Sequence, residues 1–226
     1  MMKTRDGNMP DIFARLAAGV LVAALALQSQ APPTWAAKFK LLTDPKKTCS
    51  AVTISGDIVA GDYNRFAAAL KKAASTAPVR RLYLNSAGGQ ILAAFAITDL
   101  IRQRAPTAET IVQSRQICNS ACVIILTVGV QKYVSRRATV IIHRAFDEHT
   151  RISNLELTKQ QGEFMVANGM PPSVIQTMAN LGPKEEIQIT RSNAKKLGFG
   201  SFEFYKSANP PATPQCSWAG QVRVKP

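Results

Sequence analysis

The chain has 226 residues, 46% of them hydrophobic, and a formal net charge of +14. This length supports one substantial core and therefore one main domain. Lysine and arginine are scattered without a run of five or more, and no RNA-binding motif, helix-turn-helix signature or zinc-finger spacing accompanies them. We therefore expect a generally basic surface with at most weak attraction to anionic membranes, and no specific nucleic-acid partner.

The N-terminus has the order of residues that is typical of a secretory signal peptide. Three cations precede an uncharged apolar run from Leu16 to Leu27, and small or polar residues follow it. This run has 12 residues, fewer than the roughly 20 needed to cross a bilayer, which favours a cleaved signal over a retained membrane anchor. We expect a signal peptide within residues 1–36, cleaved after Ala31 or Ala36, and an exported, periplasmic protein.

The segments that follow alternate between strand and helix patterns. In chain order we expect a strand at 51–55, a helix at 62–74 capped by Asp62, a strand at 79–84, a helix at 90–103, a strand at 110–113, a helix at 120–128, a strand pair at 132–134 and 139–142, two helices within 154–179, a strand at 187–189 and a short helix at 192–197. This order predicts an α/β domain at 37–206, with a mostly parallel sheet flanked by helices, and an irregular tail at 207–226.

Four cysteines follow the signal region: Cys49, Cys118, Cys122 and Cys216. In an exported protein this even number predicts up to two disulfides, with three connectivities open. Cys118 and Cys122 are close along the chain but poorly oriented for a bond if both lie on one regular helix. A bond at Cys216 would hold the tail in place. The chain has only two histidines and shows no four-ligand set, so we expect no metal and no cofactor.

Unusual residues stand at two predicted strand ends, where ligands gather in parallel α/β sheets. One strand leads into NSAGG at 85–89, whose glycines let the backbone turn sharply and expose its amides, and another ends at His143. Between them, Ser120 lies at a predicted loop-to-helix junction, where free amides favour developing negative charge. On spacing alone, the simpler interpretation of Ser120 is a helix N-cap.

The segment from Leu82 to His143 resembles the ClpP serine peptidases and the wider crotonase-like superfamily. Its motifs are LYLNSAGG, ITDLIR, CNSAC, a hydrophobic helix ending in VG, and ATVIIH, in the family's order and approximate spacing. The resemblance implies repeated β-β-α units and a homo-oligomer that uses the segment 154–179. Ala87 departs from the family's NSPGG loop, where a proline is usual, and Ala93 and Ala94 stand where a glycine is common.

The resemblance also implies roles for individual residues. Ser120 matches the family's nucleophile and His143 its general base, and the backbone amides of Gly89 and Ala121 match the oxyanion hole. The residues that would support the glycine loop are Asn85, Ser86 and Gly88.

For the acid of the triad, the alignment leaves two neighbouring glutamates as candidates. Aligning on Ala194 and Gly198 puts Glu186 where the family has an aspartate, and a shift of one residue would exchange it with Glu185. Two solvated glutamates before a strand are the alternative interpretation.

Together these features predict an exported serine protease or related acyl hydrolase that acts on peptides or proteins. One alternative is a non-catalytic module of the same fold that binds peptides or supports assembly. Another is a crotonase-type enzyme acting on acyl thioesters, which export disfavours because coenzyme A substrates are intracellular. The chain has no ATP-binding motif, so an unfoldase is not built into it.

Overall fold

The computed structural model describes residues 34–147, 150, 152–207, 209–214 and 216–218. The chain divides into two units, Met1–Thr34 and Trp35–Pro226, and every element below belongs to the second. The predicted signal peptide lies almost entirely outside the described residues. Within the described part, no helix is both long and apolar enough to cross a membrane.

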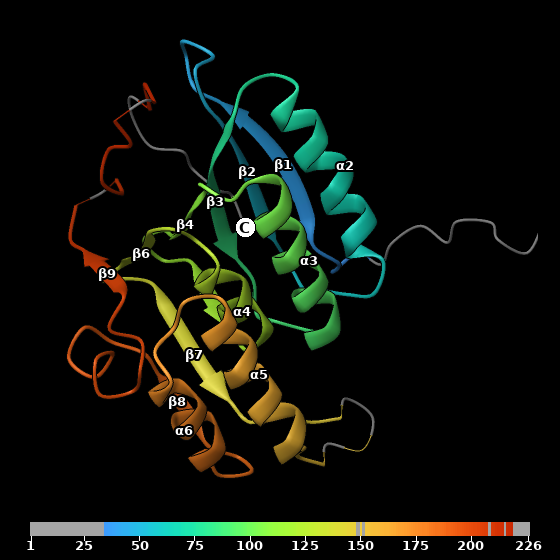
Figure 1. The fold of residues 1–226 in the computed structure, drawn as a ribbon, viewed down its shortest axis with the longest axis vertical. Coiled ribbons are helices and arrows are strands. Elements are labelled where there is room, and N and C mark those ends of the chain that lie inside the picture. Colours follow the sequence, from blue (N-terminus) through green and yellow to red (C-terminus); the bar gives the residue numbers. More distant parts are fainter. Residues whose placement is uncertain (1–33, 148–149, 151, 208, 215, 219–226) are drawn as a thin grey trace, which may run out of the picture. The chain divides into compact units, whose positions relative to one another are not determined.

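The larger of two sheets has six strands and is parallel except at one edge (Figure 1). Its strands, in spatial order, are β1 (Lys38–Thr43), β2 (Ser50–Ser55), β3 (Val79–Asn85), β4 (Glu109–Val112), β6 (Lys132–Ser135) and β9 (Phe202–Tyr205). β1 pairs with β2 in antiparallel register, and each later neighbour is parallel. Parallel strands need crossover connections, which the intervening helices supply. This confirms the predicted mixed α/β fold with a mostly parallel sheet.

The smaller sheet places β7 (Thr139–His143) between β5 (Ile117–Asn119) and β8 (Glu186–Gln188). β5 is parallel to β7, and β8 is antiparallel to it. The predicted pairing of 132–134 with 139–142 is wrong, because the turn between β6 and β7 carries the chain from the larger sheet to the smaller one. β5 was not predicted, since three residues are too few to show an alternating pattern.

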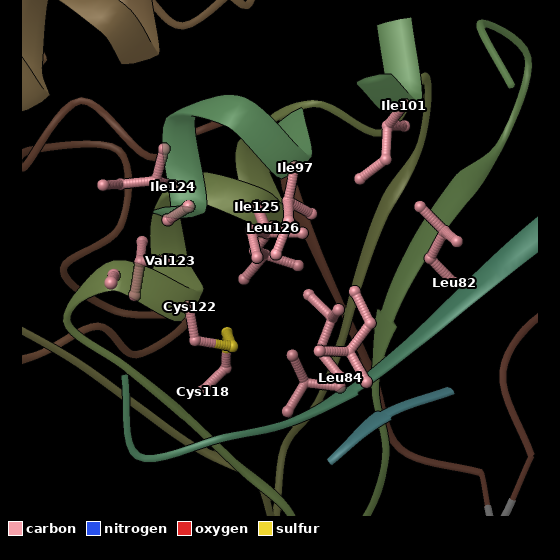
Figure 2. Close-up of a cluster of buried hydrophobic side chains, with 14 of the residues drawn as sticks. Leu82, Leu84, Ile97, Ile101, Cys118, Cys122, Val123, Ile124, Ile125 and Leu126 are labelled. Carbon is pink, nitrogen blue, oxygen red and sulfur yellow. A yellow bond between two sulfur atoms is a disulfide. The ribbon is translucent and has the colours of Figure 1, made fainter. Parts of the chain in front are cut away.

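The helices are α2 (Asp62–Ala74), α3 (Ile91–Arg104), α4 (Ala121–Thr127), α5 (Leu155–Ala167) and α6 (Ser173–Asn180). The first three form the layer on the core face of the larger sheet, whereas α5 packs on α4 and on α6. Every residue of α4 is buried, as expected for a helix that is apolar on all sides. In Figure 2, Ile125 and Leu126 of α4 lie close to Ile97 of α3, and Leu82 and Leu84 of β3 belong to the same buried cluster. The helix that follows Ser120 is therefore fixed inside the core.

Two local predictions are wrong. Asp62 does not cap α2: the cap position is Gly61, and the buried Asp62 carboxylate accepts a hydrogen bond from the Val59 amide at 2.8 Å and pairs with Arg65. Residues 192–197 form turns instead of a helix. There the Asn193 side chain accepts a hydrogen bond from the Thr190 amide and donates one to a backbone carbonyl, which offers the backbone an alternative to helical bonds.

The C-terminal tail packs against the face of the larger sheet that the helices leave open. Tyr83 of β3, Tyr133 of β6 and Tyr205 of β9 belong to one buried cluster on this face, and Trp218 of the tail packs on that cluster. Beside them, the buried ion pair between Arg81 and Glu109 is joined by a tail threonine, Thr213, which donates a hydrogen bond to the Glu109 carboxylate at 2.7 Å. A disulfide between Cys49 and Cys216 fastens the tail to the start of β2.

Asp44 forms a second fastening between the tail and the sheet. Asp44 as a residue is 2% exposed, and its carboxylate accepts hydrogen bonds from Ser217, Thr48 and the Cys49 amide. Burial alone raises the pKa of the Asp44 carboxyl, but these hydrogen bonds outweigh it and hold the pKa well below its ordinary value. The folded state therefore favours the ionised form.

This lowered pKa predicts a pH-dependent contribution from Asp44. The stabilisation is fully present above the ordinary carboxyl pKa and is lost as the pH falls toward the lower folded value. We expect Asp44→Asn to lower the free energy of unfolding by a constant amount above about pH 5, and the difference from wild type to shrink in more acidic solution. Urea titrations of both proteins at several pH values measure this difference in the free energy of unfolding. A difference that is independent of pH would contradict the assignment.

Candidate active site

Ser120 joins β5 to α4 with a backbone conformation that few residues other than glycine adopt. Its φ is 52° and its ψ is −123°, and its side chain makes no capping hydrogen bond to α4. Such a conformation costs on the order of 1–3 kcal/mol and persists only where the surroundings enforce it. Here the Ser120 amide donates to the Ile141 carbonyl at 2.9 Å, and the Asn119 amide donates to the Ser86 carbonyl at 3.1 Å. Ser120 therefore occupies the N-cap position of α4, as its spacing predicts, but its side chain does not cap the helix.

A disulfide spans this turn. Cys118 lies on β5 and Cys122 on α4, with their Cα atoms 5.2 Å apart and both side chains fully buried. The bond is compatible with the four-residue spacing because the sharp turn at Ser120 removes the two cysteines from one regular helix. Figure 2 shows the bond at the base of α4. Of the three connectivities left open by the sequence, the structure has Cys49 with Cys216 and Cys118 with Cys122.

The glycine loop touches Ser120 directly. A Cβ atom at Gly88 would lie 2.7 Å from the Ser120 Cβ and 2.7 Å from the Asn119 carbonyl oxygen, and Gly88 has a φ of 111°. The Ser86 hydroxyl accepts a hydrogen bond from the Gly88 amide at 3.1 Å, and the Asn85 side chain accepts one from the Ile117 amide at 3.2 Å. These bonds hold the loop against β5, and the lack of a side chain at Gly88 permits the close approach.

Two backbone amides near Ser120 are directed away from other backbone partners. Ile58 pairs with the loop by donating to the Gly88 carbonyl at 2.7 Å and accepting from the Gln90 amide at 2.8 Å. The amide of Gly89, which lies between these two, therefore points to the other side of the loop. Ala121 is the first residue of α4, so its amide has no acceptor within the helix. Both amides are available to a developing negative charge.

His143 ends β7, the strand next to Ser120. Asn119 is the partner of Ile141 in the parallel register, so Ser120 and His143 are one residue apart across neighbouring strands. The structure shows no direct hydrogen bond between these two described side chains, and both are partly exposed.

The surroundings of His143 determine which ring nitrogen carries the proton. Nδ1 lies 2.8 Å from the Arg144 carbonyl oxygen, which can only accept, so Nδ1 is the donor. In the neutral ring, Nε2 is then the basic nitrogen. The ring also stacks on Phe146, with centroids 5.4 Å apart. Sequence reasoning missed Arg144 and Phe146, although both closely follow the predicted strand end.

The two candidate acids differ in what they contact. Glu186 is the direct cross-strand partner of His143 in the β7–β8 pair, so the two side chains share one face of the sheet. The Glu185 carboxylate instead accepts a hydrogen bond from the Gly182 amide at 2.8 Å. Between His143 and either glutamate, the described part of the chain has no hydrogen bond. The register favours Glu186 over Glu185 as the partner of His143.

The described residues contain no group of three or more His, Cys, Asp or Glu side chains placed to hold a metal ion. The side chains and amides that the candidate site does bring together are those of Ser120, His143, Gly89 and Ala121. Such an arrangement can accelerate acyl transfer, in which a hydroxyl attacks a carbonyl and the amides stabilise the resulting oxyanion.

A family model described as Clp protease matches residues 47–192. The chain belongs to the Clp protease family. The matched segment runs from β2 to the turn after β8, so it includes Ser120, His143 and Glu186. β9 and the fastened tail of this Clp protease family member lie beyond the match.

Solved structures are similar to this Clp protease family chain in fold. The ClpP protease catalytic domain from Plasmodium falciparum has 17% sequence identity and a TM-score of 0.54, with 73% of this chain and 88% of that chain covered. A ClpP1 mutant from Listeria monocytogenes has 15% identity and a TM-score of 0.47, covering 70% of this chain and 91% of that one. No curated protein matches the chain. The first likeness supports the fold; activity has to be argued from the site.

Proposed function

We propose that this member of the Clp protease family is an exported serine peptidase or related acyl hydrolase. The observation that carries the proposal is the conformation of Ser120, which is held at positive φ between β5 and α4, against Gly88 and one residue across from His143. A strained serine at a strand-to-helix turn exposes its hydroxyl above the sheet, which is where nucleophiles of α/β hydrolases act.

In the proposed reaction, the Ser120 hydroxyl attacks the substrate carbonyl while Nε2 of His143 accepts its proton. The carbonyl oxygen becomes an oxyanion that accepts hydrogen bonds from the amides of Gly89 and Ala121. When this tetrahedral intermediate collapses, the scissile bond breaks, and His143 gives the proton to the leaving group. A water molecule then hydrolyses the acyl-enzyme by the same steps.

Two groups would support the imidazole. The Arg144 carbonyl already fixes the Nδ1 proton and so keeps Nε2 basic. Glu186, which faces the same side of the smaller sheet, would stabilise the imidazolium formed during attack. Peptides or proteins are the proposed substrates, with a homo-oligomer as the working form and α5 and α6 as the contact segment.

Labelling with a fluorophosphonate probe tests the nucleophile. We expect the oxidised wild-type protein to be labelled, and Ser120→Ala and His143→Ala to lose labelling, with ester or peptide hydrolysis reduced on the order of 10⁴-fold or more. Ser75→Ala, at an exposed serine after α2, is the matched control and should be labelled like wild type. Circular dichroism establishes that each variant is folded.

A second candidate is a non-catalytic module of the same fold that binds peptides. The observation that favours it is that Ser120 and His143, both within the described residues, are not hydrogen-bonded to each other. A folded wild-type protein that resists the probe would exclude the hydrolase and support this module. Labelling that survives in Ser120→Ala would place the reactive group elsewhere.

A further inference from the structure

A pocket of about 510 Å³ lies beside the end of β6, apart from Ser120 and His143. Its walls come from the turn after β6, from β9, and from the end of β8 with the segment that follows it. Ser135 and Phe204 contribute from the larger sheet and Gln188 from the smaller one. The pocket therefore lies where the two sheets meet.

The charged side chains that line this pocket are both cationic. Arg136 and Arg191 line it, and neither forms an ion pair with any described residue. The described lining contains no aspartate or glutamate. Two unpaired guanidinium groups in one pocket favour an anionic ligand, and their planar forks match a carboxylate with paired hydrogen bonds.

The remaining lining indicates what the anion is attached to. Ile189 and Phe204 give the pocket an apolar wall, while Thr190 and Ser192 place hydroxyl groups 2.9 Å apart beside the arginines. A carboxylate on an aliphatic or aromatic stem fits this mixture better than a fully hydrated inorganic ion. The C-terminal carboxylate of a polypeptide and a glutamate or aspartate side chain share this chemistry.

The position of the pocket connects it to the candidate active site. Gln188 is the cross-strand partner of Ile141, two residues before His143, and its side chain shares a face with His143. Ala138, on the far wall, is five residues before His143. With the rise per residue of an extended strand, Gln188 lies about 7 Å and Ala138 about 17 Å from His143, measured along the direction of β7.

We propose that this pocket binds a carboxylate of the polypeptide substrate, about two to five residues from the bond attacked by Ser120. The inference rests on the proposed function and assigns a substrate class to the same site: polypeptides that carry an acidic side chain, or their own C-terminus, at that distance. Arg136 and Arg191 would bind the carboxylate, and the apolar wall would bind its stem.

Direct binding tests the proposal without requiring cleavage. The probes are alanine–serine decapeptides with a neutral fluorophore, compared in pairs. One pair has a free C-terminal carboxylate or a C-terminal amide. The other pairs are C-terminal amides that carry either a single Glu or a single Gln at the same position, with that position moved along the peptide. Fluorescence anisotropy with the oxidised Ser120→Ala protein should show about five- to tenfold tighter binding of the carboxylate-bearing member of a pair. The C-terminal acid and the internal Glu peptides distinguish the two sources of the carboxylate.

Arg136→Gln and Arg191→Gln should each remove most of this preference and leave unchanged the binding of the peptides without a carboxylate, which are the plain C-terminal amide and the Gln amides. Arg137→Gln is the matched control, because this exposed arginine is next in sequence but does not line the pocket. The proposal is overturned if the C-terminal acid binds no better than its amide and every Glu peptide binds no better than its Gln counterpart. An equal loss of the preference in Arg137→Gln would overturn it as well. Fluorophosphonate labelling is independent of these outcomes, so failure of the pocket and failure of the Ser120 hydrolase are distinguishable.

Discussion

Gly88→Ala is expected to reduce hydrolysis on the order of 10²-fold or more, even though no side chain of the proposed triad is changed. The new Cβ would lie 2.7 Å from the Ser120 Cβ and from the Asn119 carbonyl oxygen, at a φ of 111° that alanine rarely adopts. Either the glycine loop or the turn at Ser120 must move, and displacements near 1 Å at a reacting group cost about this factor. Steady-state hydrolysis and fluorophosphonate labelling rates measure the effect.

Gly61→Ala separates backbone strain from the contact with Ser120. Gly61 has a φ of 87°, and no atom lies within 4 Å of the position that a Cβ would take, so alanine there meets the conformational cost without a collision. We expect this variant to lose about 1 kcal/mol of stability and to keep wild-type activity. If both glycine variants lose activity equally, or if Gly88→Ala is fully active, the loop does not position Ser120.

Removing the disulfide between Cys49 and Cys216 is expected to have the largest effect on stability. The bond joins residues 167 positions apart, and closing so long a loop in the unfolded chain is worth about 5 kcal/mol. Cys49→Ala combined with Cys216→Ala should lower the melting temperature by about 10–20 °C. Calorimetry of the oxidised proteins gives this value.

The second disulfide supplies the comparison for the first. Cys118 and Cys122 close a loop over only four positions, for which the same entropy argument gives about 2 kcal/mol. Cys118→Ala combined with Cys122→Ala should therefore melt at a clearly higher temperature than the variant without the disulfide between Cys49 and Cys216. It should nevertheless lose more activity, because the disulfide between Cys118 and Cys122 spans the turn that carries Ser120. The opposite order of melting temperatures would contradict the chain-entropy explanation.

The elements that can be predicted from the sequence are those in which the spacing of apolar residues repeats over several turns within one segment. α2 was predicted with the observed bounds, Asp62–Ala74, because its apolar residues recur with helical spacing, and α3 was predicted to within one residue. The motifs at 85–89, at Ser120 and at His143 also fell at strand ends, since glycine and short apolar runs mark such junctions.

What the sequence did not predict depends on contacts between distant segments. The short strand β5 exists because it pairs with β7 and with the Ser86 bridge, and no pattern within its three residues signals this. The transfer of the chain between the sheets after β6 is likewise set by partners far away in the sequence. The residue type of Asp62 predicts a helix cap, because aspartate is common at that position, whereas its carboxylate accepts a hydrogen bond from the Val59 amide.

The fastened tail limits how copies of this protein can associate. Helices cover one face of the six-stranded sheet, and on the other face Trp218 of the same chain packs on the cluster that contains the tyrosines. The disulfide between Cys49 and Cys216 holds this tail in place, together with the hydrogen bonds that Asp44 and Thr213 make. A second copy would have to displace the tail to stack on the tyrosines, so we expect any assembly of the oxidised protein to use sheet edges or helix surfaces.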